Sequence, residues 1–190
     1  MNGAVRDAWV KEKLSKIPAG WKILDVGAGL SPYKSACSHL EYMSQDFCKY
    51  DGGGDGKALQ TGIPVKGADI VSDICAIPLE DESVDAILCT EVLEHVPDPV
   101  AGLREMCRLI KSGGVLVLTA PFCSLTHFSP YHFCSGFNSY FYLYWLTELG
   151  FADIEITANG DFFQYVRQEL DRLPQVEKKH GLPVTKWETD

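Results

Sequence analysis

Short apolar segments alternate along this chain with segments whose apolar residues recur at the spacing of an amphipathic helix. Apolar runs of roughly four to eight residues that end at a glycine or an acid are typical of buried parallel strands. Strands that alternate with helices form βαβ units, which build a mostly parallel sheet with helices on both faces. The sequence therefore predicts an α/β fold with a doubly wound, mostly parallel sheet. The expected strands are 21–26, 42–45, 68–72, 84–90, 115–120 and 152–156.

Helices are expected before the first strand and between the strands. A side chain that can cap a helix, followed by proline, predicts a helix start, and this pattern occurs twice. We expect the helix at the second occurrence to end at Gly113 and Gly114, and another helix to cover 139–149. The two occurrences are Ser31-Pro32 and Asp98-Pro99.

The length of the chain, 190 residues, suits one domain with its own hydrophobic core. The sequence shows no internal repeat and no linker that would divide it. We therefore expect a single domain over 1–190. Its expected parts are an N-terminal helix over 1–17, a core over about 21–157 and a helical C-terminal extension over 158–190.

Charge and composition limit the partners. The chain has 17 basic and 26 acidic residues, and the resulting net charge of −9 disfavours binding to nucleic acid or anionic lipid. The longest apolar run, 115–122, is far shorter than the ~20 residues of a membrane span. Seven cysteines without a C-x-x-C pair, and no secretory leader, indicate reduced thiols. We expect a cytoplasmic monomer or homodimer that binds neither nucleic acid nor a membrane.

Acidic residues close three successive expected strands, at the edge of the sheet where such folds bind ligands. Asp25 precedes a turn in which Gly27 and Gly29 let the backbone pass close to a ligand. Asp46 can accept hydrogen bonds from both hydroxyls of a ribose, and Asp73 from an adenine amino group. Three carboxylates at three strand ends are hard to explain without a ligand, because burying an unpartnered carboxylate is unfavourable.

The glycine turn taken alone leaves two other interpretations open. A dinucleotide-binding fingerprint would require a third glycine at position 32, which is Pro32, and Asp25 would repel a pyrophosphate. Asp25 instead suits a cationic ligand that carries an amino group. The second interpretation is a strand with a glycine turn that binds no ligand.

Five segments in this order resemble the class I S-adenosylmethionine-dependent methyltransferases, most closely the branch called type 11. Two of them are Ile23-Leu-Asp-Val-Gly-Ala-Gly29 and Glu91-Val-Leu-Glu-His-Val-Pro97. The resemblance implies a Rossmann-like methyltransferase fold and S-adenosyl-L-methionine as the cofactor. Class I methyltransferases usually finish the sheet with an antiparallel seventh strand, for which we find no good candidate after Ile156. The five segments are 23–29, 73–79, 83–89, 91–97 and 109–115.

The resemblance also implies roles for single residues. The turn after the first strand would line the methionine end of the cofactor, Asp46 would hold the ribose, and Asp73 would hold the adenine. No metal is implied, because the sulfonium of the cofactor is already activated. The implied cofactor-binding residues are Asp25, Gly27, Ala28, Gly29, Asp46, Asp73, Ile74, Thr90 and Glu91.

The segment 127–137 departs from the family pattern, because His132 stands where the family has an aspartate. The way in which family members recognise their acceptors therefore cannot be carried over to this chain. His127, Tyr131 and His132 are possible bases on the acceptor side, and we select His127 and His132 as the candidate catalytic bases. The alternative is a loop that covers the cofactor only by aromatic packing. Glu94 followed by His95 looks like an acid–base pair, but the resemblance favours a packing role at a helix start.

The expected reaction is methyl transfer to an oxygen, nitrogen or carbon nucleophile, on a small-molecule methyl acceptor. A protein or tRNA methyltransferase is a second hypothesis, which the acidic charge disfavours. A non-catalytic S-adenosylmethionine-binding or regulatory protein is a third, consistent with the altered 127–137 segment. An NAD-dependent oxidoreductase is the last, and Pro32 argues against it.

Overall fold

The computed structural model describes residues 2–53, 64–65, 67–181 and 183. It divides the chain into two compact units, Asp7–Glu155 and the pair of segments Met1–Arg6 and Ile156–Asp190, and each is described by itself. The expectation of a single domain over 1–190 stays a prediction.

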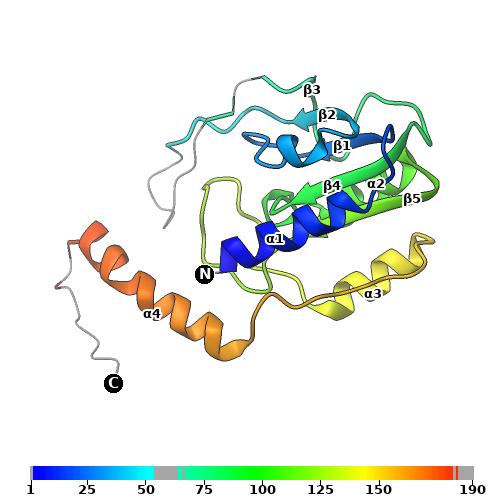
Figure 1. Cartoon of the computed structure of the whole chain (residues 1–190). Helices are drawn as coiled ribbons and strands as arrows, with labels where there is room; N and C mark the ends of the chain where they lie inside the picture. Colours follow the sequence, from blue (N-terminus) through cyan, green and yellow to red (C-terminus); the bar gives the residue numbers. More distant parts are fainter. Residues whose placement is uncertain (1, 54–63, 66, 182, 184–190) are drawn as a thin grey trace. The chain divides into compact units, whose positions relative to one another are not determined.

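The larger unit contains a five-stranded sheet in which all pairs are parallel (Figure 1). The spatial order β3-β2-β1-β4-β5 confirms the predicted doubly wound fold. The strand order reverses between β1 and β4, which makes the carboxyl ends of these strands the expected ligand site. The strands are β1 (Lys22–Val26), β2 (Glu41–Asp46), β3 (Ile70–Val71), β4 (Val84–Thr90) and β5 (Ile110–Thr119).

Two hydrophobic clusters lie on the two faces of the sheet, because successive side chains of a strand point to opposite faces. One cluster contains Val10 and Leu14 of α1 (Asn2–Ser15), and the other contains Leu103 and Met106 of α2 (Pro99–Leu109). The sheet residues are Ile23, Ala86 and Leu88 in the first cluster, and Leu24, Ile87 and Cys89 in the second.

The start of α2 is as predicted, but its end is not. The Asp98 carboxylate accepts a hydrogen bond from the Ala101 N–H at 2.9 Å, which caps the helix. The helix ends at Leu109, and Gly113 and Gly114 lie inside β5, beside an irregularity in its pairing with β4. A Cβ at Gly114 would lie 2.7 Å from the Asp85 carbonyl oxygen, so this glycine permits close packing of two strands rather than ending a helix.

The helix predicted after Ser31 does not form, and only a short 3₁₀ helix, Lys34–Cys37, is present there. Ser31 has a φ of +52°, whereas a helix N-cap has extended backbone at negative φ. The hydroxyl therefore does not occupy the position of a cap.

The predicted sixth strand is also absent, since residues 152–156 form no strand and, in the described part of the chain, no strand follows β5. Asp153 has a φ of +52°, which interrupts the extended backbone that a strand needs. The preceding helix, α3 (Ser139–Glu148), agrees with the prediction and is capped by the side chain of Asn138.

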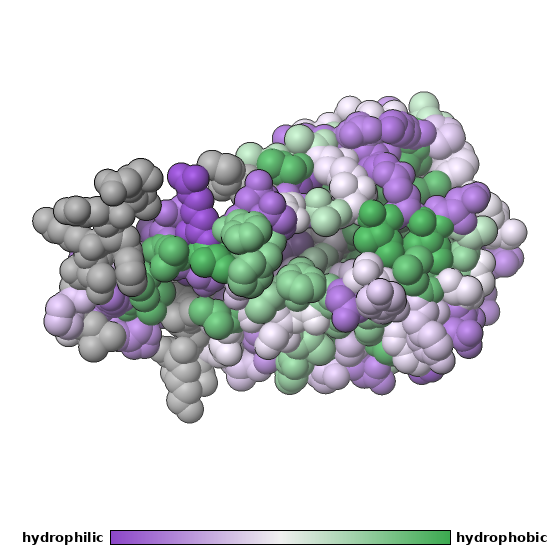
Figure 2. Space-filling model, turned by 90° about the horizontal axis from the view of Figure 1, so that it is seen from below, coloured by the Kyte–Doolittle hydropathy of each residue, from purple (hydrophilic) through white to green (hydrophobic). Residues whose placement is uncertain are grey.

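The smaller unit contains α4 (Phe162–Lys179), whose first turn is capped by the Asp161 carboxylate. Phe162 and Phe163 of this helix are exposed. On one face of the molecule, hydrophobic residues lie at the surface among hydrophilic ones (Figure 2). Among the described residues, no helix combines the length and the apolarity needed to cross a membrane.

Candidate functional site

The backbone of the turn after β1 is shaped by two glycines. Gly27 and Gly29 have φ values of +64° and +55°, in the left-handed region that glycine adopts most readily. A Cβ at Gly27 would lie 2.6 Å from both γ-carbons of Val92, so a larger residue cannot fit there without displacing that side chain. The turn therefore requires glycine at position 27.

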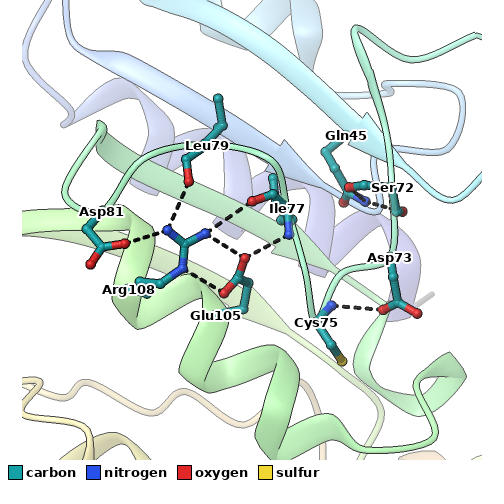
Figure 3. Close-up of polar contacts among 9 residues, drawn as sticks. All are labelled: Gln45, Ser72, Asp73, Cys75, Ile77, Leu79, Asp81, Glu105 and Arg108. Carbon is teal, nitrogen blue, oxygen red and sulfur yellow. Dashed lines mark hydrogen bonds and ion pairs between the residues drawn. The ribbon is translucent and has the colours of Figure 1, made fainter.

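The N–H groups of this turn donate to the end of β2. The Gly27 N–H donates to Gln45 Oε1 at 3.2 Å, the Ala28 N–H to the Gln45 carbonyl at 2.9 Å, and the Gly29 N–H to Asp46 Oδ2 at 3.0 Å. Gln45 Nε2 also donates to the carbonyl of Ser72 at 2.8 Å (Figure 3). The buried Gln45 thus joins the ends of three strand segments, a role that the sequence analysis missed. A polar residue inside a buried strand is the signal that could have found it.

Asp25 lies near the carboxyl end of β1 and is buried, with 1% of its surface exposed. The Tyr42 hydroxyl donates a hydrogen bond of 2.6 Å to Asp25 Oδ2. Burial raises the pKa of Asp25 to about 6, and the Tyr42 hydrogen bond opposes this shift. A buried carboxylate beside a glycine turn favours a ligand that brings a positive charge. Tyr42 is a second residue of the site that the sequence analysis missed.

Asp46 ends β2 and supports the turn directly. Its Oδ1 accepts a hydrogen bond from the Cys48 N–H at 2.8 Å, and its Oδ2 accepts the one from Gly29. The structure therefore brings together the predicted residues Asp25, Gly29 and Asp46. Each carboxylate oxygen can accept more than one hydrogen bond, so these contacts leave acceptor capacity for ligand hydroxyls.

Asp73 and Ile74 lie in the segment that follows β3, which ends at Val71, so Asp73 does not directly close the strand as expected, and it is exposed. Asp73 Oδ1 accepts a hydrogen bond from the Cys75 N–H at 2.9 Å, which folds a local turn (Figure 3). The Ile74 side chain is 8% exposed and belongs to the same hydrophobic cluster as Leu103 of α2. Asp73 follows Ser72, which accepts from Gln45, so this segment is hydrogen-bonded to the end of β2.

Arg108 and Glu105 of α2 hold the rest of this segment (Figure 3). The Arg108 guanidinium donates to the carbonyls of Leu79 at 2.9 Å and Ile77 at 3.1 Å, and also to both oxygens of Glu105. Glu105 Oε1 in turn accepts from the Ile77 N–H at 2.7 Å. The ion pair with Arg108 lowers the pKa of Glu105, which keeps this carboxylate charged. Two residues of one helix thus fix the path of the chain after Asp73.

Thr90 is the last residue of β4, and Glu91 follows it with a φ of +55°. The Glu91 N–H donates to the Thr119 carbonyl at 2.8 Å, and the Thr119 hydroxyl donates to Glu91 Oε1 at 2.9 Å. This pair of hydrogen bonds holds Glu91 to the end of β5.

The loop after β5, which we call the 121–137 loop, is attached to the residues after β4. The N–H groups of Phe133 and Cys134 both donate to the Glu94 carbonyl, at 2.8 and 3.2 Å. The Tyr131 ring contacts Phe47, the residue after Asp46, with 5.0 Å between ring centroids. The predicted acceptor loop therefore adjoins the predicted cofactor residues.

Three of the five histidines of the chain gather at this loop. The ring of His127 lies 4.8 Å from that of His95 and 4.6 Å from that of His132, centroid to centroid. His132 Nε2 lies 3.2 Å from the Ser124 hydroxyl. Burial, and then a charge on His127, lower the pKa of His132. Both candidate bases thus lie in one cluster.

Glu94 and His95 are part of the same cluster. Glu94 is 1% exposed, and its Oε1 lies 3.7 Å from His95 Nε2 and 4.0 Å from His127 Nε2. Burial lowers the pKa of His95 to about 4, against the effect of its hydrogen bond to the Tyr131 carbonyl. The imidazole of His95 is therefore neutral at neutral pH. From the sequence these two residues were expected to pack at a helix start, with no link to His127.

The fold and this edge of the sheet define a class of protein. A parallel sheet of this order, a glycine turn that follows β1 and carboxylates at the ends of β1 and β2 are the features of a class I methyltransferase fold.

The comparison with known families agrees. Residues 24–118, half of the chain, match the family described as a methyltransferase domain, and the chain belongs to this family. The family predicted from the sequence, the type 11 branch of the class I enzymes that use S-adenosyl-L-methionine, is thereby confirmed.

Curated relatives of the chain are also named methyltransferases. Over 119 residues the chain is 33% identical to the ubiquinone biosynthesis O-methyltransferase of Pseudomonas entomophila, covering 58% of this chain and 47% of that protein. Over 117 residues it is 32% identical to an uncharacterized methyltransferase of Mycobacterium leprae, covering 60% of this chain and 42% of that protein. The chain thus spans less than half the length of these two relatives.

Solved structures share the fold at low sequence identity. The YcgJ protein of Bacillus subtilis matches with a TM-score of 0.61 and 17% identity, over 91% of this chain and 81% of that one. A SAM-dependent methyltransferase of Archaeoglobus fulgidus matches with a TM-score of 0.57 and 17% identity, over 97% and 90%.

Proposed function

We propose that this chain transfers the methyl group of S-adenosyl-L-methionine to a nucleophilic atom of a small-molecule acceptor. The observation that carries this proposal is the buried Asp25, placed under a glycine turn that Gln45 and Asp46 hold by hydrogen bonds. The bound cofactor would supply an activated methyl group, and the remaining work of the protein is to hold the acceptor in line with it.

We propose the following roles for the residues of the site. Asp25 in its ionised form attracts the amino group of the cofactor, and the turn at Gly27, Ala28 and Gly29 leaves room for its methionine end. Asp46 accepts hydrogen bonds from the ribose. Asp73 and Ile74 border the adenine, with Ile74 fixed by the core behind it, and Thr90 with Glu91 closes the pocket.

The acceptor side of the proposed site is the 121–137 loop. We propose that His127 or His132 removes the proton from the acceptor, because an imidazole nitrogen can accept a proton from a hydroxyl or amine nucleophile. The His127 ring also contacts the rings of Phe128 and His132. One relative is named as an O-methyltransferase, so hydroxyl-bearing small molecules are the first acceptors to test.

The remaining details of the proposal rest on composition. All seven cysteines are free thiols, which supports a reducing, cytoplasmic location. The net charge of −9 supports a small-molecule acceptor over tRNA. We propose a monomer or homodimer that uses neither nucleic acid nor a membrane as its partner.

Calorimetric titration with S-adenosylhomocysteine and with NAD tests the cofactor assignment. We expect binding of S-adenosylhomocysteine alone, and binding of NAD alone would refute the proposal. Release of S-adenosylhomocysteine in the presence of a panel of hydroxyl, amine and carbon acceptors then tests catalysis. Tight cofactor binding with no turnover on any acceptor would favour the hypothesis of a non-catalytic binding protein.

The two candidate bases are tested once an acceptor is known. Replacing the true base by alanine should lower the turnover rate ~10²–10⁴-fold and leave cofactor affinity intact. His127→Ala and His132→Ala are compared with His39→Ala, a histidine outside the cluster whose ring bonds the Ile17 carbonyl. Near-normal turnover in both test variants would show that alignment alone is used.

A further inference from the structure

Two histidines and one glutamate of the cluster bring possible metal-ligand atoms close together. One ligand atom from each of Glu94, His95 and His127 lies within 4.8 Å of the other two. The side chains come from two different segments, Leu93–His95 after β4 and the 121–137 loop. The three side chains are 1%, 15% and 16% exposed, so this place is shielded from bulk water.

The backbone fixes which ring nitrogens are free to bind. His95 Nδ1 lies 2.5 Å from the Tyr131 carbonyl oxygen, and His127 Nδ1 lies 2.9 Å from the Leu125 carbonyl oxygen. A carbonyl oxygen only accepts, so each Nδ1 carries the hydrogen and donates it. In the neutral rings, each Nε2 therefore presents a lone pair.

These two lone pairs face a carboxylate oxygen. Glu94 Oε1 lies 3.7 Å from His95 Nε2 and 4.0 Å from His127 Nε2. Three electron-rich atoms that converge in this way repel one another unless a metal cation or a shared proton lies between them. An imidazole that donates its Nδ1–H to a backbone carbonyl and presents Nε2 is also the usual form of a metal-bound histidine in proteins.

We propose that Glu94, His95 and His127 form a binding site for a divalent transition-metal ion, with Zn²⁺ as the ion of choice. Two imidazoles and one carboxylate are a donor set that zinc uses when it keeps one position open. At zinc–ligand distances of about 2.0–2.2 Å, neighbouring ligands of a tetrahedral site lie about 3.4 Å apart. The two distances from Glu94 Oε1 exceed this by about 0.3 and 0.6 Å, and all three ligand atoms lie within 4.8 Å of one another, so the side chains would move closer together around a bound ion.

This site departs from the sequence-based expectation that no metal is used. It also divides the roles of the two candidate bases, because ion binding and proton transfer by His127 would both need its Nε2 lone pair. His132 lies outside the ligand set and keeps its own nitrogen, so it is the base that can act while an ion is bound.

Metal binding is measured on the full chain with any affinity tag removed and after dialysis against EDTA. Zn²⁺ is titrated by calorimetry, and Co²⁺ by its visible absorption, which reports nitrogen and oxygen ligands directly. We expect one ion per chain. His127→Gln should lower the affinity at least ~100-fold, since even residues that only support a ligand contribute 10–100-fold.

The matched control is His180→Gln, an exposed histidine at the end of α4, which should bind the ion as the wild type does. Zn²⁺ should raise the melting temperature of the wild type and of His180→Gln, and not that of His127→Gln. Circular dichroism is used to check that His127→Gln is folded. Absence of stoichiometric binding, or equal binding by His127→Gln, would overturn the proposal and leave a cluster that shares a proton.

The metal proposal stands apart from methyl transfer, and a second variant separates the two. Asp25→Asn should lose affinity for S-adenosylhomocysteine and keep the Zn²⁺ site. His127→Gln should lose the Zn²⁺ site and keep affinity for S-adenosylhomocysteine in metal-free buffer. Failure of one measurement therefore does not affect the other.

Discussion

Asp25→Asn is expected to make the protein more stable at neutral pH while weakening cofactor binding. The Asp25 carboxyl is buried, and burial raises its pKa from 3.8 to about 6. The charged form is thus disfavoured in the folded state by about two pKa units, which corresponds to ~3 kcal/mol of unfolding free energy. Asparagine removes the charge and retains an oxygen that can accept the hydrogen bond of Tyr42.

The sign of the pH dependence follows from the raised pKa. Below about pH 4 the carboxyl is protonated in both the folded and the unfolded state. The unfolding free energies of the wild type and of Asp25→Asn should therefore change with pH in the same way there. Between about pH 4 and pH 6 the unfolded chain ionises first, and wild-type stability falls. Above about pH 7 the variant should be more stable than the wild type by ~2–3 kcal/mol.

Urea unfolding at a series of pH values measures this difference. Asp85→Asn is the control of opposite sign, because Lys111 and the backbone of Lys22 lower the pKa of Asp85. That variant should be less stable than the wild type at neutral pH, and the difference should fade in acid. A stability difference for Asp25→Asn that does not vary with pH, or that is negative above pH 7, would refute the assignment of a buried carboxylate with a raised pKa.

Three further variants test the site. Asp46→Ala should bind S-adenosylhomocysteine ~10–100-fold more weakly and also lose ~1–3 kcal/mol of stability, because the Gly29 N–H loses its acceptor; unchanged affinity in calorimetry would remove Asp46 from the site. Gly27→Ala should be less stable by more than ~1 kcal/mol in urea unfolding, because its Cβ meets Val92; wild-type stability would contradict the close approach. Arg108→Ala should lose ~2–3 kcal/mol of unfolding free energy, since the guanidinium donates to two carbonyls and to Glu105. Arg104→Ala, on the same helix and with a cation–π contact to Trp145, should lose less than ~1 kcal/mol. Equal losses would argue that the Arg108 hydrogen bonds do not stabilise the segment after Asp73.

The central strands could be predicted because their apolar pattern leaves few alternatives. Val84–Thr90 of β4 has the predicted bounds, and β1 differs by one residue, since both strands are buried on both faces. At the edges the same reasoning fails. Residues 152–156 alternate apolar and acidic residues as a strand would, yet the left-handed backbone of Asp153 ends any pairing there.

Asp25, Asp46 and Asp73 were predicted as cofactor residues from expected strand ends, because parallel strands bring their carboxyl ends to one edge, whereas Ala28, Ile74, Thr90 and Glu91 were implied by the family resemblance. The contacts that hold them could not be found in this way. The Tyr42 hydroxyl reaches Asp25 because the register pairs Ile23 with Tyr42, and register is not visible in a single sequence. The histidine cluster was missed for a similar reason, since His95 and His127 are 32 positions apart and meet only when the 121–137 loop returns to Glu94.

The attachment of the 121–137 loop has a consequence for how such a protein can change during evolution. The Glu94 carbonyl accepts from the N–H groups of Phe133 and Cys134, and the two legs of the loop are joined by the Ser124 N–H and the Ser135 carbonyl. These bonds involve main-chain atoms only, so they do not depend on which side chains the loop carries. Substitutions in the loop can therefore alter the lining of the proposed acceptor side while its anchoring points persist and the turn after β1 stays unchanged.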